Sequence, residues 1–211
     1  MEKIIVGIDV GNTKSGVCSI LDCRINKAAV ISNGGVIDLL RDYKSSYDVY
    51  VVIEDIVSYE GKVNADVIAT IKWIGELCYR LRAELGISYT LLERWKVKQW
   101  CFDNYKDVCL PEIQKNIVRL DNYAIKYNED NKDKKGFIKR KRYIKKDGSY
   151  YSGSFAYVDD RIVIKAMKAH WAIETPKAFQ SNPYGLSSHS WQSLGLVTCY
   201  IESNMGALDI K

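Results

Sequence analysis

The sequence predicts an α/β protein in which a mixed β-sheet is flanked by helices. Three observations predict this fold class. Short β-prone runs near the N-terminus are separated by tight turns, which indicates an antiparallel meander. The nearly continuous apolar run VYVVIED, residues 49–55, is typical of a strand buried on both faces. Segments whose apolar residues recur with the period of a helix lie between and after the later strands.

Three strands are expected first, over residues 3–10, 15–22 and 28–37. The Asn33-Gly34-Gly35 sequence should break the third strand, because glycine and asparagine favour turns. A short helix and a loop should then lead to the buried strand 49–55.

The segment 63–86 is expected to form an amphipathic helix. Its apolar residues recur at spacings of 3, 4, 3 and 4, and Gly86 should end the helix. The residues of that apolar face are Ile71, Ile74, Cys78, Leu81 and Leu85.

The second half of the chain is expected to be mainly helical. Its elements are a strand at 87–93, a helix at 95–105, a helix opened by Pro111, a helix starting at Asp159-Asp160, and a last helix at 187–203.

A strongly basic hairpin is expected within residues 130–157. Residues 132–146 carry nine Lys or Arg against one Asp, and Asp147-Gly148 is typical of a type I′ turn. A basic ribbon with aromatic side chains can bind nucleic acid, whereas the alternative is a solvated loop. The side chains expected to contact DNA are Lys139, Arg140, Lys141, Arg142, Lys145, Tyr150 and Tyr151.

Length and composition predict one domain over residues 1–211, with residues 101–157 inserted in it. The 211 residues suffice for one well-filled core, and 47% hydrophobic with 27% charged residues is ordinary for a globular protein. The N-terminus has no signal-peptide pattern and the apolar runs are of strand length, so we expect neither secretion nor a membrane span. Six cysteines without a CxxC pair are expected to be reduced thiols in a cytoplasmic compartment.

Two acids stand where strands are otherwise apolar. Asp9 lies inside the first strand and Glu54 lies at the end of the buried strand. On adjacent strands their carboxylates would repel each other unless a cation such as Mg²⁺ or Mn²⁺ lay between them. The alternative is that Asp9 caps the following GNTK turn and that Glu54 faces solvent.

His189 and Gln192 share one face of the last helix, because they are three residues apart. His189 could be a third metal ligand, or it could be a cap or a surface residue.

The order of these motifs resembles that of RuvC-type Holliday-junction resolvases. IIVGIDVGNTKSGVCSI (4–20) resembles their first hairpin, with Asp9 as the first catalytic acid, and VVIEDI resembles the strand that carries the catalytic glutamate, Glu54. RWKVKQW places Lys98 at a DNA-contacting position, and VDDRIVIKAMKAHW places Arg161 at another. HSWQSLGL resembles the final-helix motif that carries the last two ligands.

The resemblance implies an RNase H-like nuclease that cuts branched DNA with Mg²⁺, for which Mn²⁺ substitutes. Asp9 would bridge two ions, Glu54 would bind one, and His189 would help to hold the other. The protein would be a homodimer in contact through helix 68–81, and it would be cytoplasmic or nucleoid-associated.

Gln192 departs from the family pattern, which usually has an acid at this position, and this puts cleavage in doubt. Two other functions stay open. DVGNTKSG also resembles the first phosphate loop of actin-like small-molecule kinases, although a second loop of that type is missing. The chain could also be a catalytically impaired relative that binds junctions.

Overall fold

A computed structural model describes residues 1–56, 64–130, 158–173 and 184–204 of the chain. Five strands form one sheet in the order β3-β2-β1-β4-β5. β1 pairs antiparallel with β2 and parallel with β4, while β3 and β5 extend the two sides. The predicted mixed sheet is therefore confirmed. The strands are β1 (Lys3–Asp9), β2 (Lys14–Leu21), β3 (Arg24–Ser32), β4 (Asp48–Asp55) and β5 (Ser88–Glu93).

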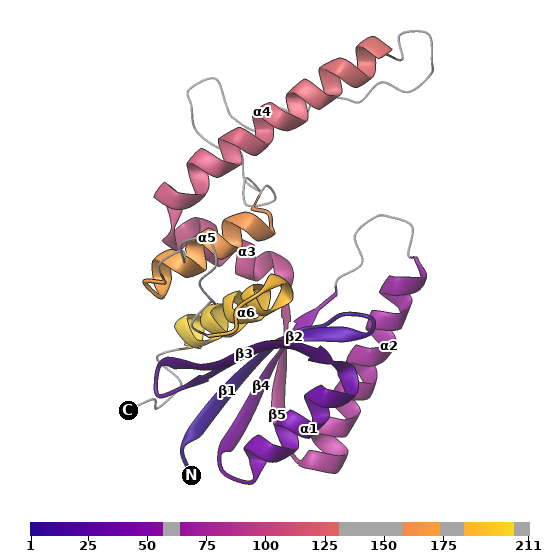
Figure 1. Cartoon of the computed structure of the whole chain (residues 1–211), viewed down its shortest axis with the longest axis vertical. Helices are drawn as coiled ribbons and strands as arrows, with labels where there is room; N and C mark the ends of the chain where they lie inside the picture. The colour runs from indigo at the N-terminus through magenta and orange to yellow at the C-terminus, as the bar shows by residue number, and fades with distance from the viewer. Residues whose placement is uncertain (57–63, 131–157, 174–183, 205–211) are drawn as a thin grey trace.

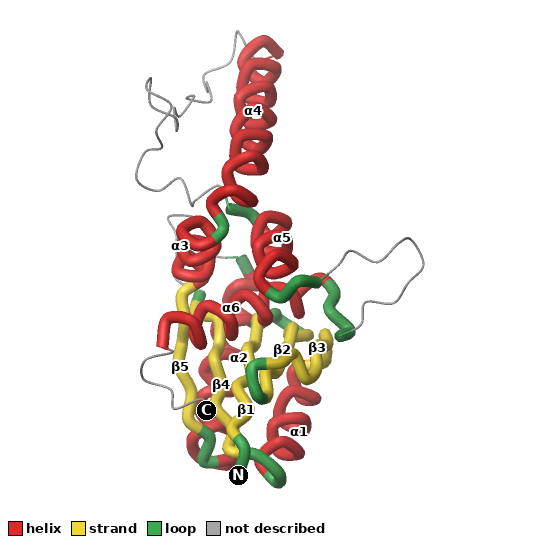
Figure 2. Tube along the Cα trace, turned by 90° about the vertical axis from the view of Figure 1, so that its left-hand side faces the viewer, coloured by secondary structure: helices red, strands yellow, loops and turns green. Residues whose placement is uncertain are grey.

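Helices cover both faces of the sheet. Figure 1 shows α1 and α2 on one face and α6 on the other, with α3 and α5 stacked on α6 and α4 projecting beyond them. Figure 2 shows the same layers from the side. The helices are α1 (Asn33–Lys44), α2 (Ala65–Tyr79), its π-helical continuation η1 (Arg80–Leu85), α3 (Arg94–Asn104), α4 (Lys106–Asp130), α5 (Asp160–His170) and α6 (Ser188–Asn204).

The sheet separates two hydrophobic clusters. One lies between the sheet and α6 and continues into α3, α4 and α5, with Leu194 and Val197 of α6 at its centre. The other lies under α1, α2 and η1, with Leu40 and Leu77 fully buried. β1 and β4 contribute side chains to both clusters, which explains why their sequences are almost continuously apolar.

The third expected strand is wrong beyond Ser32. The Ser32 Oγ accepts a hydrogen bond from the Gly35 backbone N–H at 3.2 Å, so Ser32 caps α1. Asn33, Gly34 and Gly35 are therefore the first turn of a helix instead of a break within a strand. The serine cap satisfies a backbone donor at the helix start, and this outweighs the low helix propensity of the two glycines.

Pro111 does not open its helix, contrary to expectation, because α4 starts at Lys106. The backbone N–H groups of Val108 and Cys109 both donate to the Tyr105 carbonyl oxygen, at 3.0 and 2.8 Å. The first turn is thus established before the proline, which lies inside the helix.

The buried face of α2 differs in part from the predicted one. Ile74 is buried as expected, but Ile71 is 47% exposed, and Trp73 and Leu77 are buried in its place. Gly86 ends the segment in a left-handed conformation at φ 57°, as predicted. Apolar residues occur on more than one side of this helix, so periodicity alone does not select the side that meets the sheet.

The six cysteines are free thiols, and Cys18, Cys101, Cys109 and Cys199 are buried. Within the described ranges, no helix combines the length and the apolar character that crossing a bilayer would need.

Candidate active site

Three neighbouring parallel strands present polar side chains at their carboxyl ends. Asp9 is the last residue of β1, Glu54 is the penultimate residue of β4, and Arg94 directly follows β5. Asp9 and Glu54 are only 4% and 8% exposed, so the alternative in which Glu54 faces solvent is wrong.

The side chains at the strand ends line a pocket of about 370 Å³, together with Asp160 and His189. Asn64, Asp66 and Thr70 form its wall on the side of α2.

Two glycines allow α6 to lie directly on the sheet next to this pocket. A Cβ atom added to Gly7 would lie 2.4 Å from the Ser193 carbonyl oxygen. One added to Gly16 would lie 2.4 Å from the carbonyl oxygen of His189. Gly16 pairs with Asp9 across β1 and β2. The absence of side chains at these positions therefore brings the start of α6 over the end of β1.

His189 contacts the buried acid of β1. Its Nδ1 lies 2.8 Å from Asp9 Oδ2. The Asp9 backbone N–H donates to the Ser193 Oγ at 3.2 Å, and that hydroxyl donates to the His189 carbonyl oxygen at 3.1 Å. One turn of α6 is thus tied to Asp9 through both its backbone and its side chain.

The two buried carboxyl groups influence each other's pKa, and burial is the largest influence on the pKa of both. Burial raises the pKa of Asp9 above its ordinary value. Burial also raises the pKa of Glu54, and the hydrogen bond with Asp9 and the charge of Asp9 raise it further, while Arg94 opposes the shift. The pair therefore favours holding a proton, and a cation that neutralised it would release that proton.

Arg94 links Glu54 to the start of α5. Its Nη1 donates to Glu54 Oε1 at 3.0 Å and its Nη2 donates to Asp160 Oδ1. The nearby carboxylates of Glu54 and Asp160 raise the pKa of this guanidinium, although burial opposes the shift. Arg94 is thus a permanent positive charge in the pocket.

Gln192 lies outside the group of residues that line the pocket. Its Nε2 donates to the backbone carbonyl oxygen of Asp160 at 3.3 Å, so its amide connects α6 to α5. The structure therefore brings Asp9, Glu54 and His189 together and gives Gln192 a different contact.

The predicted DNA-contacting residues are divided between the site and its surroundings. Burial and the charge of Arg94 lower the pKa of Lys98 on α3, and Asp160 and Glu54 also act on it, so Lys98 lies close to the site. Arg161 is exposed and pairs with Asp159, the N-cap of α5, at 3.2 Å. The other predicted contacts lie outside the described residues: Lys139, Arg140, Lys141, Arg142, Lys145, Tyr150 and Tyr151.

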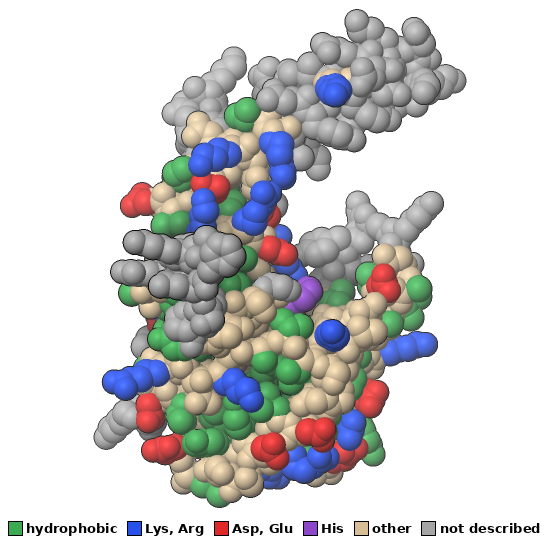
Figure 3. All heavy atoms as spheres, viewed as in Figure 1, with side chains coloured by type: hydrophobic (Ala, Val, Ile, Leu, Met, Phe, Trp, Pro, Cys, Tyr) green, Lys and Arg blue, Asp and Glu red, His purple; other side chains and the backbone are tan. Residues whose placement is uncertain are grey.

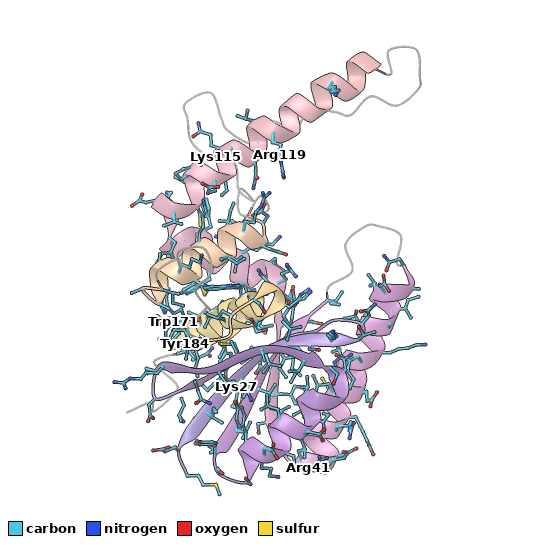
Figure 4. The ribbon with its side chains drawn as sticks, in the orientation of Figure 1. Lys27, Arg41, Lys115, Arg119, Trp171 and Tyr184 are labelled. Atoms are coloured by element: carbon cyan, nitrogen blue, oxygen red, sulfur yellow. The ribbon has the colours of Figure 1, made fainter. Side chains whose placement is uncertain are left out.

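Basic side chains also gather above the site. Figure 3 shows Lys and Arg side chains over α4 and α5, on the same side of the molecule as the start of α6. Figure 4 labels two of them, Lys115 and Arg119, on α4. Lys115 and Lys165 share Glu112, at 2.8 and 2.7 Å, so part of this charge is neutralised locally.

Sequence reasoning missed Arg94 and expected Asp159 and Asp160 only to cap a helix. Asp159 does supply the cap, by accepting hydrogen bonds from the backbone N–H groups of Arg161 and Ile162, whereas Asp160 contacts Arg94. Arg94 carried a usable signal, because it follows a strand that was expected to lie in the same sheet. Nothing in the sequence indicated that Asp160 belongs to the site, because its position depends on how α5 packs.

The donor atoms of the pocket suit a hard divalent cation, which prefers carboxylate oxygens. Asp9 and Glu54 supply buried oxygens and His189 supplies a ring nitrogen. In the present arrangement His189 and Arg94 contact the two acids directly, and the described residues contain no group of three His, Cys, Asp or Glu side chains gathered as a metal cage. Asp9, Glu54 and His189, which line one pocket, are the side chains whose donor atoms would hold such a cation.

The strand order, the mixed pairing and the helices on both faces define an RNase H-like fold. Two solved structures of RuvC from Thermus thermophilus share this fold. One matches at a TM-score of 0.51 and 14% identity, over 96% of this chain and 96% of that chain. The other, of RuvC in complex with Holliday junction substrate, matches at a TM-score of 0.52 and 12% identity, over 97% of this chain and 96% of that chain. No protein-family model and no curated protein sequence match the chain.

The RuvC-like fold predicted from the sequence is thereby confirmed, and the two matches cover 96% and 97% of the chain. At 12–14% identity the likeness concerns the fold, so the chemistry of the site has to be argued from its own residues.

Proposed function

We propose that this protein is a divalent-metal-dependent endonuclease that cuts branched DNA such as a Holliday junction. The observation that carries the proposal is the buried pair Asp9 and Glu54 at the ends of β1 and β4, with His189 on Asp9. Buried acids on adjacent strands are costly without a cation, and this pair stands in a pocket of a RuvC-like fold. The neighbouring RuvC structure with a Holliday junction substrate supports branched DNA as the ligand.

Asp9, Glu54 and His189 would hold the cation, Mg²⁺ or Mn²⁺. The resemblance to RuvC-type resolvases implies two ions per site. The bound cation would activate a water molecule and stabilise the departing 3′ oxygen of the cut phosphodiester. The chain itself positions the ligands: Ser193 fixes the Asp9 backbone, and the strand ends keep both acids largely buried.

A homodimer would place two such sites on one junction. The outward face of α2 carries the exposed apolar side chains of Ile68, Ile71 and Tyr79, which are 45%, 47% and 66% exposed. Gly75 lies between them and its added Cβ would meet nothing, so this face is open. Exposed apolar side chains in a row favour contact with another protein surface.

Phosphate contacts would come from Lys98 and Arg161 close to the site and from Lys115 and Arg119 on α4. The basic segment within residues 130–157 remains a predicted contact. A protein that acts on chromosomal or replicating DNA would be cytoplasmic or nucleoid-associated.

One observation favours a second candidate, a relative that binds junctions without cutting them. Gln192 is uncharged and is engaged with the Asp160 backbone, so it does not supply the acid that this position usually holds in the family.

Cleavage of labelled DNA separates the two candidates. Four-way, flapped and linear duplexes are incubated with the protein and Mg²⁺, Mn²⁺ or a chelator. The nuclease predicts paired nicks in branched DNA that need the metal, and Asp9→Asn should abolish them while junction binding is kept. Asp38→Asn is the matched control, because Asp38 is exposed on α1 and pairs with Arg41, away from the pocket. Tight junction binding without nicks in any metal would favour the second candidate.

A further inference from the structure

Arg94 is held in the pocket by two acids that belong to different elements. Its Nη1 donates to Glu54 Oε1 on β4 at 3.0 Å, and its Nη2 donates to Asp160 Oδ1 on α5. A strand end and a helix start therefore hold the guanidinium from two sides. A charged group that is fixed in advance in this way needs no reorganisation when a substrate arrives.

The guanidinium still has donors for a ligand. An arginine side chain carries five N–H donors, and within the described part of the chain Arg94 uses one on each terminal nitrogen. The side chain is 38% exposed and lines the pocket, so the remaining donors are accessible. Because the guanidinium is a planar fork, it matches the oxygens of a phosphate.

Arg94 is the one lysine or arginine among the described residues that line this pocket. The lining also contains His189 and five acids, which are Asp9, Glu54, Asp55, Asp66 and Asp160. A phosphodiester that enters the pocket is repelled by these carboxylates. The groups that attract it are therefore the bound cation and the guanidinium on the wall.

A phosphate contact by Arg94 is compatible with the proposed metal ligands. Arg94 contacts Glu54 through a single carboxylate oxygen, and an ionised carboxylate offers about four lone-pair sites. Glu54 can therefore bind a cation while it also holds Arg94.

A second cation lies close to Arg94. Lys98 follows Arg94 by one turn of α3, so the two side chains share a face of this helix. Their charges act on each other. Two neighbouring positive charges favour an anion between them, just as two neighbouring acids favour a cation.

We propose that Arg94 is a catalytic residue of the nuclease, which donates hydrogen bonds to a non-bridging oxygen of the phosphate that is cut. The proposal rests on the proposed function. In the cut, the oxygen of a water molecule forms a bond to phosphorus while the bond to the 3′ oxygen breaks. The water loses one proton and the 3′ oxygen gains one. Arg94 stabilises the negative charge that develops on the non-bridging oxygens during this exchange.

Single-turnover nicking of a four-way junction tests this role. With protein and Mg²⁺ in excess, Arg94→Gln should nick about 100-fold more slowly than the wild type, as is typical when one such donor is removed. Arg94→Lys keeps the charge but loses the planar fork, so its rate should lie between the two. Arg41→Gln is the matched control, because Arg41 pairs with Asp38 on α1 at the far end of the molecule (Figure 4).

Metal binding separates a phosphate contact from mere support of Glu54. The electron paramagnetic resonance of free Mn²⁺ measures the affinity of the protein for Mn²⁺ without DNA. If Arg94 only positioned Glu54, Arg94→Gln would weaken Mn²⁺ binding. We expect equal or tighter binding, because the substitution removes a positive charge from the pocket.

A neutral phosphate analogue provides a readout that does not depend on activity. The cut positions are first mapped with the wild type, and a junction is then made with methylphosphonates at these positions. Binding is compared in proteins that carry Asp9→Asn, so that the junction stays intact. With Arg94 present, the neutral junction should bind about tenfold more weakly than the ordinary one, because a charge-assisted hydrogen bond is lost. With Arg94→Gln added, the two junctions should bind equally.

The outcomes distinguish this proposal from the function on which it rests. If the wild type cuts branched DNA and Arg94→Gln cuts it equally fast, or if Arg94→Gln loses Mn²⁺ affinity, the role of Arg94 is wrong and the nuclease stands. If the wild type cuts no DNA with any metal, both are overturned. A thermal unfolding scan checks each fold, and Arg94→Lys, which keeps the charge, carries the same comparisons if Arg94→Gln does not fold.

Discussion

Gly16 lies directly beneath the backbone of His189. A Cβ atom at Gly16 would come within 2.4 Å of the His189 carbonyl oxygen and 2.8 Å of its Cβ atom. Real Cβ atoms do not approach other atoms this closely, so a larger residue requires α6 to move. Since His189 contacts Asp9 from this turn of α6, the glycine determines how close the histidine comes to the acid.

Gly16→Ala should therefore weaken metal binding and nicking more than it weakens the fold. The added methyl group would push His189 away from Asp9, and we expect at least a tenfold loss of Mn²⁺ affinity, as is common when the groups around a metal are misplaced. Mn²⁺ titration and nicking rates measure this. Gly34→Ala is the matched control, because a Cβ atom there meets nothing within 4 Å. Equal effects of the two substitutions would contradict the argument.

Stability should depend on pH through Glu54. Its pKa in the folded protein is raised above the ordinary 4.5 by burial and by Asp9. The stabilising contribution of the protonated form is complete below pH 4.5 and is lost as the pH rises through the raised pKa. Wild-type protein without metal should thus lose stability with rising pH, and Glu54→Gln should lose less.

Urea unfolding from about pH 4 to pH 9 measures this difference. Because the carboxyl pair must lose its proton to hold a cation, Mn²⁺ affinity should rise over the same range. Parallel stability curves for wild type and Glu54→Gln would show that Glu54 is not the titrating group.

A charge on the outer face of α2 should break the proposed dimer. Ile71→Glu places a carboxylate among the exposed Ile68 and Tyr79 side chains, where a partner surface would bury it without a counter-charge. Sedimentation or light scattering should show monomers, with single nicks replacing paired nicks. Val118→Glu, on the exposed side of α4, should leave the oligomeric state unchanged. A wild-type protein that is monomeric at all concentrations would refute the dimer.

Salt dependence should identify the phosphate contacts. Arg161→Gln should weaken binding to all branched DNA equally and reduce the slope of log affinity against log salt by about 1, because one fewer counterion is released. Lys27→Gln is a control, since Lys27 lies on β3, away from α4 and α5 (Figure 4). An unchanged slope for Arg161→Gln would remove this residue from the interface.

The sequence by itself determined that five strands exist, the bounds of four of them, most helix boundaries and the acids Asp9 and Glu54. These features follow from local rules. A short apolar run predicts a strand, and apolar residues that recur every three or four positions predict a helix. A carboxylate in an apolar strand needs a partner, because burying its charge alone is costly. The helix end at Gly86 could also be predicted, because glycine readily adopts the left-handed conformation found there. The break expected at Asn33 and the helix start expected at Pro111 were wrong, because the Ser32 cap and the hydrogen bonds to the Tyr105 carbonyl oxygen start these two helices earlier.

The tertiary structure alone decided which charges share the pocket. Arg94 and Asp160 are 66 residues apart, and their contact depends on how α5 packs beside the end of β5. The same packing engages Gln192 with the Asp160 backbone and leaves His189 on Asp9. Such contacts arise between elements whose relative positions are set by the burial of their apolar faces, and periodicity along one segment carries no information about them.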